Sequence, residues 1–293
     1  MKQLYRLVTF SMLLFYSISA WAQSASDYRM AANNGDRVAQ YNLGLCYYNG
    51  YGVTKDYKQA VYWWTKAANQ GDAAAQSNLG FCYDNGYGVT KDYKQAVYWY
   101  TKAANQGVAA AQSNLGVCYK NGDGVTKDYK QAVYWYTKAA NQGYAAAQYN
   151  LGLCYYNGYG VTKDYKQAVY WWTKAANQGY AAAQNNLGVC YNNGDGVTKD
   201  YKQAVYWYTK AVNQGYAAAQ SSLGECYEHG DGVEQDYKQA AYWYRKAADQ
   251  GNAFAQLKLG LFYYFGYHFA KDNEKARYWL RSCLKMNKKE LYG

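Results

Sequence analysis

Among the side chains that could act as nucleophiles or metal ligands, this chain contains seven cysteines and two histidines. Six of the cysteines recur every 36 residues in the same context, at Cys46, Cys82, Cys118, Cys154, Cys190 and Cys226. A nucleophilic Cys-His arrangement needs a histidine partner, and zinc sites typically show C-x-x-C spacing. Here His229 and His268 lie in unrelated contexts, and no C-x-x-C occurs. The sequence therefore predicts no catalytic residue, no metal site and no cofactor.

The six periodic cysteines are expected to be reduced. Equivalent helices in neighbouring repeats pack roughly 8–10 Å apart, whereas a disulfide needs Cα atoms within about 7 Å. We therefore predict a ladder of buried thiols that act as small apolar packing residues. Cys283 stands outside the ladder and is expected nearer the surface.

Tyrosines at variable positions are the best candidates for binding. Three positions of the repeat vary between the copies, and we call each such position a slot. Where these slots hold tyrosine, they give two clusters: Tyr41, Tyr48 and Tyr51 with Tyr87, and Tyr149, Tyr156 and Tyr159. The slot of Tyr41 elsewhere holds Ser77, Ser113, Asn185, Ser221 and Leu257. Such variation predicts exposed side chains, and tyrosine is favoured in recognition surfaces. The alternative is that tyrosine is simply common, because the chain contains 40.

The elements that position these side chains repeat with a 36-residue period, which indicates a solenoid. In the unit 72–107, apolar spacing predicts a helix over 72–85 and a second over 92–106, separated by Gly86 and Gly88 and ended by Gly107. A glycine recurs in the middle of each first helix, at Gly44, Gly80, Gly116, Gly152, Gly188, Gly224 and Gly260. Since mid-helix glycine is destabilising, its recurrence predicts that another helix crosses closely there.

The domain organisation follows from this period. We expect a half-repeat cap over 23–35, seven repeats over 36–286 and a polar tail over 287–293. The repeats are 36–71, 72–107, 108–143, 144–179, 180–215, 216–251 and 252–286. Residues 39–71 are identical to residues 147–179, which indicates a duplication of three repeats.

The repeat resembles the Sel1-like repeat family, which is related to tetratricopeptide arrays. The matching residues in one copy are Ala75, Leu79, Gly80, Tyr83, Gly86, Gly88, Val89, Asp92, Ala96, Trp99, Tyr100, Ala103, Ala104 and Gly107. The resemblance implies an all-α, right-handed superhelical solenoid of antiparallel helix pairs, with the first helix of each pair on the concave side. The chain departs from the family where Thr90 and its equivalents replace proline, and where His268 and Phe269 replace Gly and Val.

The N-terminal segment predicts export. Residues 1–22 combine Lys2 and Arg6, an apolar run and an A-W-A cleavage site, as a signal peptide does. No later run is long enough to span a bilayer, so the chain is not expected to be an integral membrane protein after cleavage. The net charge is +11, and export makes nucleic acid a poor partner for it.

Much of the positive charge falls on two lysine ladders of the second helices. They are Lys58, Lys94, Lys130, Lys166, Lys202 and Lys238, and Lys66, Lys102, Lys138, Lys174, Lys210 and Lys246. The ladders fit either an acidic partner or a solvated helix face. The pairs Trp63-Trp64 and Trp171-Trp172 fit packing between repeats better than a sugar-binding platform.

These features favour an exported, periplasmic or secreted scaffold that binds an extended protein or peptide along the first helices. Binding of cell-wall glycan or another acidic surface is a second hypothesis. A third is a β-lactam- or peptidoglycan-acting enzyme, since some cysteine-rich relatives of the family are associated with β-lactams. Those relatives carry two cysteines per repeat, whereas this chain carries one. We therefore expect no enzymatic activity.

Overall fold

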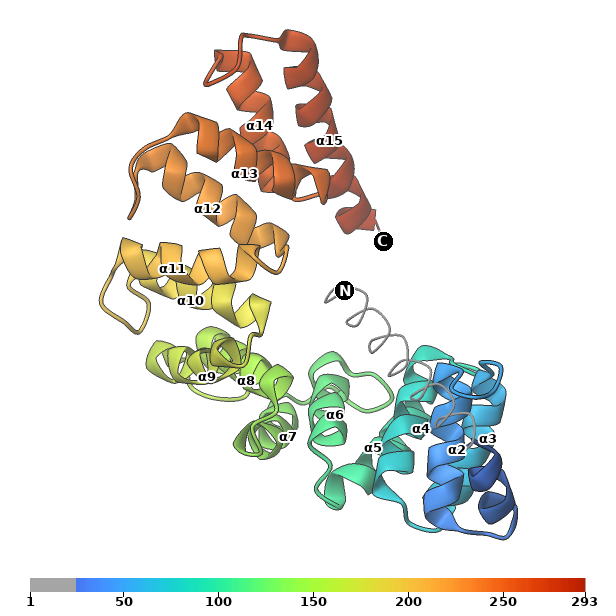
Figure 1. Cartoon of the computed structure of the whole chain (residues 1–293). Coiled ribbons are helices and arrows are strands. Elements are labelled where there is room, and N and C mark those ends of the chain that lie inside the picture. Colours follow the sequence, from blue (N-terminus) through green and yellow to red (C-terminus); the bar gives the residue numbers. More distant parts are fainter. Residues whose placement is uncertain (1–24, 293) are drawn as a thin grey trace, which may run out of the picture. The chain divides into compact units, whose positions relative to one another are not determined.

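The computed structural model describes the backbone of residues 25–292 and the side chains of residues 25–284. Every regular element in this part of the chain is a helix (Figure 1). The predicted signal peptide, residues 1–22, lies outside the described residues. We call the first helix of each repeat helix A and the second helix B.

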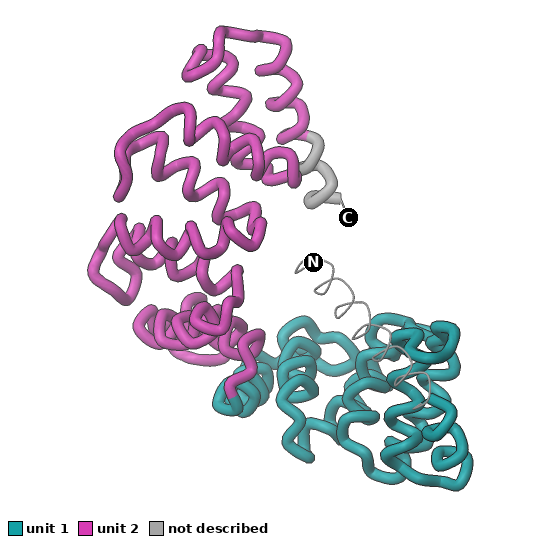
Figure 2. Tube along the Cα trace, in the orientation of Figure 1, with its two compact units in different colours: residues 1–142 teal, residues 143–293 magenta. Residues whose placement is uncertain are grey.

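The chain divides into two compact units, the first of which ends at Gln142 (Figure 2). The first unit opens with a helix over 25–33. It continues with α2 (Arg37–Asn49), α3 (Tyr57–Asn69), α4 (Ala73–Asn85), α5 (Tyr93–Asn105), α6 (Ala109–Asn121) and α7 (Tyr129–Asn141). Each helix packs against the next along the chain, as expected for a stack of hairpins.

The second unit begins at Gly143 and has the same construction. It contains α8 (Ala145–Asn157), α9 (Tyr165–Asn177), α10 (Ala181–Asn193), α11 (Tyr201–Val212), α12 (Ala217–His229), α13 (Tyr237–Asp249), α14 (Ala253–Phe265) and α15 (Asn273–Tyr292). Helix α15 continues through residues 287–292, the segment expected to be a polar tail.

An aspartate begins each complete helix B, as the pattern predicts. The Asp92 carboxylate accepts hydrogen bonds from the backbone N–H groups of Lys94 and Gln95, which satisfies donors left free by the first turn. The Asp92 N–H donates to the Tyr83 carbonyl of the preceding helix A, and this bond closes the hairpin. Helix B then ends before Gly107, whose φ of +91° suits a residue without Cβ.

The mid-helix glycines do make room for a crossing helix. A Cβ placed on Gly80 would lie 2.5 Å from Cδ1 of Tyr100, a fully buried ring of the partner helix B. The prediction of close helix crossing is therefore confirmed, and the cost of glycine is offset by the contact of the ring with the backbone.

A buried glutamine connects successive repeats. Gln76 is 4% exposed and donates from Nε2 to the carbonyl of Ala68, at the end of the preceding helix B. Its Oε1 accepts a hydrogen bond of 2.7 Å from Gln106, at the end of its own helix B. Equivalent bonds to the end of the preceding helix B are made by Gln40, Gln112, Gln184 and Gln256, so a buried polar link recurs within both units.

The first helix A is covered by the helix over 25–33. Ala32 is 1% exposed, and its carbonyl accepts a hydrogen bond from Gln40. Ala25 and Ala32 share a core with Leu43 and Cys46. The half-repeat thus packs on α2 as a complete helix B would.

Candidate binding site on the helix A surface

A pocket opens on the helix A surface of the first unit. It has a volume of about 310 Å³ and is lined by Leu45, Tyr48, Asn49, Trp64, Asn78 and Phe81. The first three residues come from α2 and the last two from α4, while Trp64 comes from α3. The pocket therefore lies at the seam between two consecutive repeats.

The second unit contains the same pocket 108 residues later. It has a volume of about 250 Å³ and is lined by Leu153, Tyr156, Asn157, Trp172, Asn186 and Val189. Every lining residue occupies the slot of its counterpart in the first unit, and only Phe81 and Val189 differ in type. We call these two sites the aromatic pockets.

The tryptophan of each pocket is held rigidly. Trp172 is 2% exposed, and a Cβ on Gly152 would lie 2.5 Å from its Cδ1, so the indole lies directly on the glycine. Its Nε1 donates a hydrogen bond of 3.1 Å to the carbonyl of Tyr149, as Trp64 does to Tyr41. The predicted packing role of these tryptophans agrees with their burial. Because the indole donor is already used, each tryptophan offers the pocket only an apolar surface.

Tyr48 and Tyr156 form the second aromatic wall. The Tyr48 ring lies 5.4 Å from Trp64 and 5.1 Å from Tyr57, and the Tyr156 ring lies 5.3 Å from Trp172 and 4.9 Å from Tyr165. This slot was expected to be exposed, whereas the packed rings of Tyr48 and Tyr156 are half-buried.

The two aromatic pockets differ in what the next repeat places beside them. In the first unit, Tyr87 contacts both Tyr48 and Phe81, with ring centroids 6.5 Å and 5.8 Å away. In the second unit the equivalent residue is Asp195, and the Tyr156 hydroxyl donates to its Oδ2 at 3.0 Å. Burial, followed by this hydrogen bond, raises the pKa of Tyr156 to about 12. The tyrosine therefore stays neutral and keeps donating at physiological pH.

The other predicted tyrosines lie around the pockets. Tyr51, Tyr87 and Tyr159 are exposed at 49%, 37% and 43%. Tyr41 and Tyr149 are half-buried, and their hydroxyls lie near pocket residues Asn78 and Asn186. The structure thus joins Tyr48 to Tyr87 directly and places Tyr41 and Tyr149 behind the pocket asparagines.

Variation between copies misled the prediction at the slot of Tyr41. It was expected to be exposed, yet it is buried in four copies: Ser77, Ser113, Asn185 and Ser221. The slot lies at the seam between repeats, where Tyr149 reaches the ring of Tyr180 in the next repeat at 5.1 Å. A short side chain is covered there, while a tyrosine extends along the seam.

The next repeat of the second unit carries an acidic version of the pocket. It has a volume of about 110 Å³ and is lined by Asn192, Tyr208, Ser222, Glu225, Cys226, His229 and Asp231. Asn192, Tyr208, Ser222 and Glu225 are the counterparts, 36 residues on, of Tyr156, Trp172, Asn186 and Val189. Burial raises the pKa of Glu225, an effect that Lys258 partly opposes. We call this site the acidic pocket.

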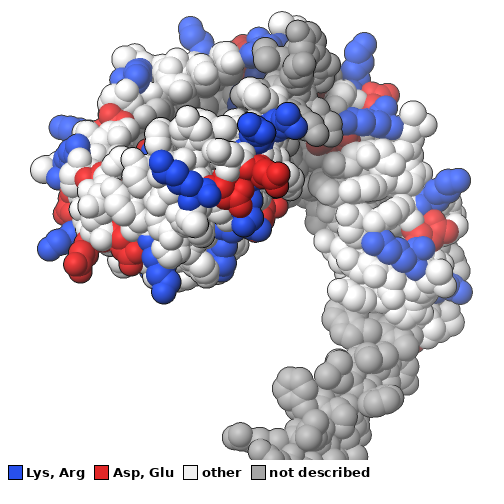
Figure 3. Space-filling view, turned by 90° about the horizontal axis from the view of Figure 1, so that it is seen from above, with Lys and Arg blue, Asp and Glu red and all other residues white. Residues whose placement is uncertain are grey.

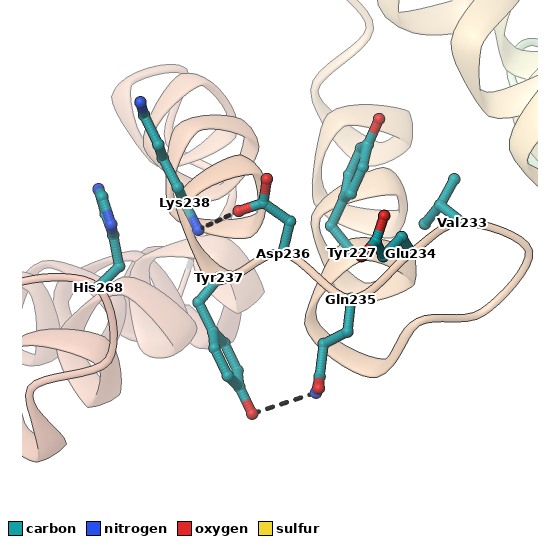
Figure 4. A pocket seen from close by; sticks show the side chains of 8 residues that line it. All are labelled: Tyr227, Val233, Glu234, Gln235, Asp236, Tyr237, Lys238 and His268. Atoms are coloured by element: carbon teal, nitrogen blue, oxygen red, sulfur yellow. Dashed lines mark hydrogen bonds between the residues drawn. The ribbon is translucent and has the colours of Figure 1, made fainter.

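A larger and shallower hollow of about 790 Å³ lies at the loop that precedes α13 (Figure 4). His268 lines one side, and Tyr237 and Lys238 line the other. In other copies the slot of His268 is a glycine whose Cβ would clash with the backbone of the preceding helix B. His268 has a φ of +62° and cannot approach as closely, so the hollow reflects the divergence of the last repeat.

The helix B surface carries the lysine ladders. Lys66 lies over the rings of Tyr62 and Trp63, with Nζ 4.6 Å and 5.0 Å from the centroids, and the same arrangement recurs from Lys102 to Lys246. Asp56 uses its carboxylate to cap the helix. On the face seen in Figure 3, basic side chains are spread over the surface and several lie beside acidic ones.

The periodic cysteines are free and buried, which confirms the predicted thiol ladder, and Cys283 is half-buried. Burial raises the pKa of Cys82, Cys118, Cys190 and Cys226 to about 12. Within residues 25–284, no group of three or more His, Cys, Asp or Glu side chains is placed to hold a metal ion. No helix among the described residues has the length and apolar character needed to cross a membrane.

Several residues of the site were not predicted from the sequence. Leu45, Phe81 and the asparagines Asn49 and Asn78 line a pocket, and Tyr57 supports its wall. One signal was available: these positions repeat at 108 residues together with the predicted tyrosines. Glu225 also stood out, because the same slot is Leu, Phe or Val in every other copy.

Comparison with known proteins identifies the fold. The Sel1 repeat model matches residues 37–72, 73–108, 109–144, 145–180, 181–216, 217–252 and 253–282. No curated protein sequence matches the chain.

Two solved structures are similar over most of the chain. The first is c5321, a protective antigen present in uropathogenic Escherichia coli strains and displaying an SLR fold, with 40% identity and a TM-score of 0.80 over 89% of this chain. The match covers 56% of that antigen, so this chain spans little more than half its length. A Sel1 repeat protein from Oxalobacter formigenes shows 37% identity and a TM-score of 0.77, over 83% of this chain and 96% of that one. With seven matching repeats and these two structural neighbours, the chain belongs to the Sel1 repeat family.

Proposed function

We propose that this protein is an exported scaffold that binds an extended segment of a protein partner along its helix A surface. The observation that carries the proposal is the pair of aromatic pockets, which have nearly the same lining in two separate units. Rigid aromatic anchors in concave sites contribute much of the energy in recognition surfaces. Two such pockets would add their contributions for a partner that reaches both.

Export to the periplasm is supported by the composition of residues 1–22, with its basic start, apolar run and A-W-A site. The thiol ladder is compatible with an oxidising compartment, because the buried thiols are largely protected from oxidants.

The pockets favour a peptide over a glycan. Sugar platforms use an aromatic face open to solvent, whereas Trp64 and Trp172 are each 2% exposed. The available space is a pocket of side-chain size, bounded by the tyrosine ring, an aliphatic residue and two amides. A bulky apolar side chain of a partner fits such a pocket better than a flat sugar ring.

The proposal can be tested by photo-crosslinking in the native cell envelope. A photoreactive phenylalanine derivative replaces Tyr156, and the control probe replaces Lys202, an exposed helix B residue. We expect a discrete protein adduct from position 156 alone. A smear of equal strength from both positions, or adducts with isolated cell-wall sacculi, would contradict a peptide-binding helix A surface.

A substitution tests the pockets directly. Tyr48→Asn with Tyr156→Asn introduces the residue that Asn192 already places in this slot, so the helices are expected to form normally. The matched control is Tyr62→Asn with Tyr170→Asn, which changes two exposed tyrosines on helix B. Only the first pair should reduce the yield of adduct obtained with a second probe at Tyr159.

A further inference from the structure

We propose that the helix A surface of the second unit binds a cationic peptide segment, with a bulky apolar side chain in the aromatic pocket and a Lys or Arg side chain in the acidic pocket. This inference rests on the proposed function and deepens it by naming the chemistry of the partner. It opposes the expectation from the net charge of +11, which by itself favours an acidic partner.

The two pockets are consecutive positions of one groove. The aromatic pocket lies between α8 and α10, and the acidic pocket uses the same slots between α10 and α12. Helix α10 contributes Asn186 and Val189 to the first and Asn192 to the second. A segment that crosses the helix A surface therefore meets the two pockets in succession.

The charge of this surface is negative although the protein is positive. On α8, α10, α12 and α14 themselves the acidic residues are Glu225 and Glu228, and the only Lys or Arg is Lys258. The loops that follow these helices add Asp195, Asp231, Glu234 and the aspartates that cap helix B, against Lys163, Lys199 and Lys271. Lys258 is already paired, because its Nζ lies 3.0 Å from Oε2 of Glu228. The remaining described lysines of this unit lie on helix B.

Glu225 and Asp231 supply the charge that a cation would meet. Both line the acidic pocket, and among the described residues neither carboxylate accepts a hydrogen bond or forms an ion pair. Lys258 and His229 offset only part of the cost of burying Glu225. A partly buried carboxylate without a hydrogen-bond partner is unfavourable, and a Lys or Arg side chain from outside would compensate it. Glu225 replaces an apolar residue in this slot alone among the seven copies.

The spacing of the two anchors follows from the repeat geometry. Packed helices lie roughly 8–10 Å apart, and an extended chain advances about 3.3 Å per residue. The apolar residue and the cation should therefore be separated by about three residues. In the first unit the slot of Glu225 holds Val117, and the carboxylates at the equivalent place are Asp84 and Asp123.

The test begins with random 12-residue peptides displayed on phage and selected on the purified protein. The expected motif is a large apolar residue followed at about the third position by Lys or Arg. A motif with acidic residues, or without any cation, would overturn the inference while leaving the proposed function standing. Selection of no peptide, or of peptides unaffected by Tyr156→Asn, would overturn both.

A charge swap then separates recognition from folding. Glu225→Lys should weaken the selected peptide by about tenfold or more, the size expected for loss of a charge-assisted contact. It should also restore binding of a peptide in which the Lys or Arg is replaced by Glu, which a merely damaged fold cannot do. The matched control is Val117→Lys in the first unit, which should leave both affinities unchanged. Equal loss for both peptides would overturn the inference.

Discussion

The hydroxyl of Tyr156 donates a hydrogen bond of 3.0 Å to the carboxylate of Asp195, across the seam between two repeats. In the first unit the same two slots hold Tyr48 and Tyr87, whose rings pack edge to face at 6.5 Å. The two aromatic pockets thus share a tyrosine in the same slot but differ in the residue that contacts it, because that residue belongs to the following repeat. A change of two residues in that repeat should be enough to alter what the pocket accepts.

We expect Val189→Phe with Asp195→Tyr to give the second aromatic pocket the surroundings of the first, where Phe81 and Tyr87 occupy these two slots. The variant should bind apolar peptides with a weaker preference for a neighbouring cation, because Asp195 contributes to the negative charge of this groove while Glu225 and Asp231 remain. Peptide competition in a Tyr48→Asn background measures this without interference from the first pocket. A preference for Lys or Arg as strong as that of the parent would contradict the assignment of Asp195.

Glu225 should make stability depend on pH. Burial raises its folded pKa above the unfolded value, so the folded state binds the proton more tightly and loses stability as pH rises through that interval. Glu225→Val, which introduces the residue of repeats three and five, should therefore stabilise the protein at pH 7, on the order of 0.5–2 kcal/mol.

Thermal unfolding of Glu225→Val and the parent across the acid range checks this prediction. The gain should shrink towards low pH, where Glu225 is protonated in both states. Glu234→Gln is a suitable control, because Glu234 is exposed. A gain that is constant with pH would mean that packing, and not the charge, is responsible.

The contact between Gly80 and Tyr100 should dominate the cost of adding a methyl group to α4. Gly80→Ala improves helix propensity by about 1 kcal/mol but places Cβ 2.5 Å from the buried ring, and overpacking costs about 1–3 kcal/mol. We expect a net loss of stability in denaturant unfolding. Tyr100→Leu, which copies the pairing of Gly260 with Leu280, should reduce that loss, whereas additive effects would contradict it.

The thiols should differ sharply in reactivity. Since burial raises the pKa of Cys82, Cys118, Cys190 and Cys226 to about 12, they carry almost no thiolate at pH 8. We expect one faster reaction with a disulfide reagent in the native protein, at half-buried Cys283, and release of the six others on unfolding. Cys283→Ser should remove the fast phase. A fast reaction that persists in this variant would contradict burial of the ladder.

Much of the fold could be predicted because its signals are local and periodic. Asp92, Gly80 and Gly107 each reveal a cap, a crossing or a helix end from their own positions, and the structure confirms all three. The linking role of Gln76 was missed, because its partners Ala68 and Gln106 belong to adjoining helix ends and no pattern identifies them. The site was harder to predict for the same reason, because Asp195, which hydrogen-bonds to Tyr156 of the pocket, lies 39 positions further along the chain.

The identical blocks 39–71 and 147–179 make the array divisible without loss of structure. Removal of residues 72–179 would join Gly71 to Tyr180, a junction equivalent to the one that now follows Gly179. Gln184 would then donate to the carbonyl of Ala68, the counterpart of its present partner Ala176. Such a chain would retain one aromatic pocket, with Asp195 beside it, and the acidic pocket. Exact internal copies therefore allow the number of aromatic pockets to change by recombination in whole steps of three repeats, without a new sequence being invented.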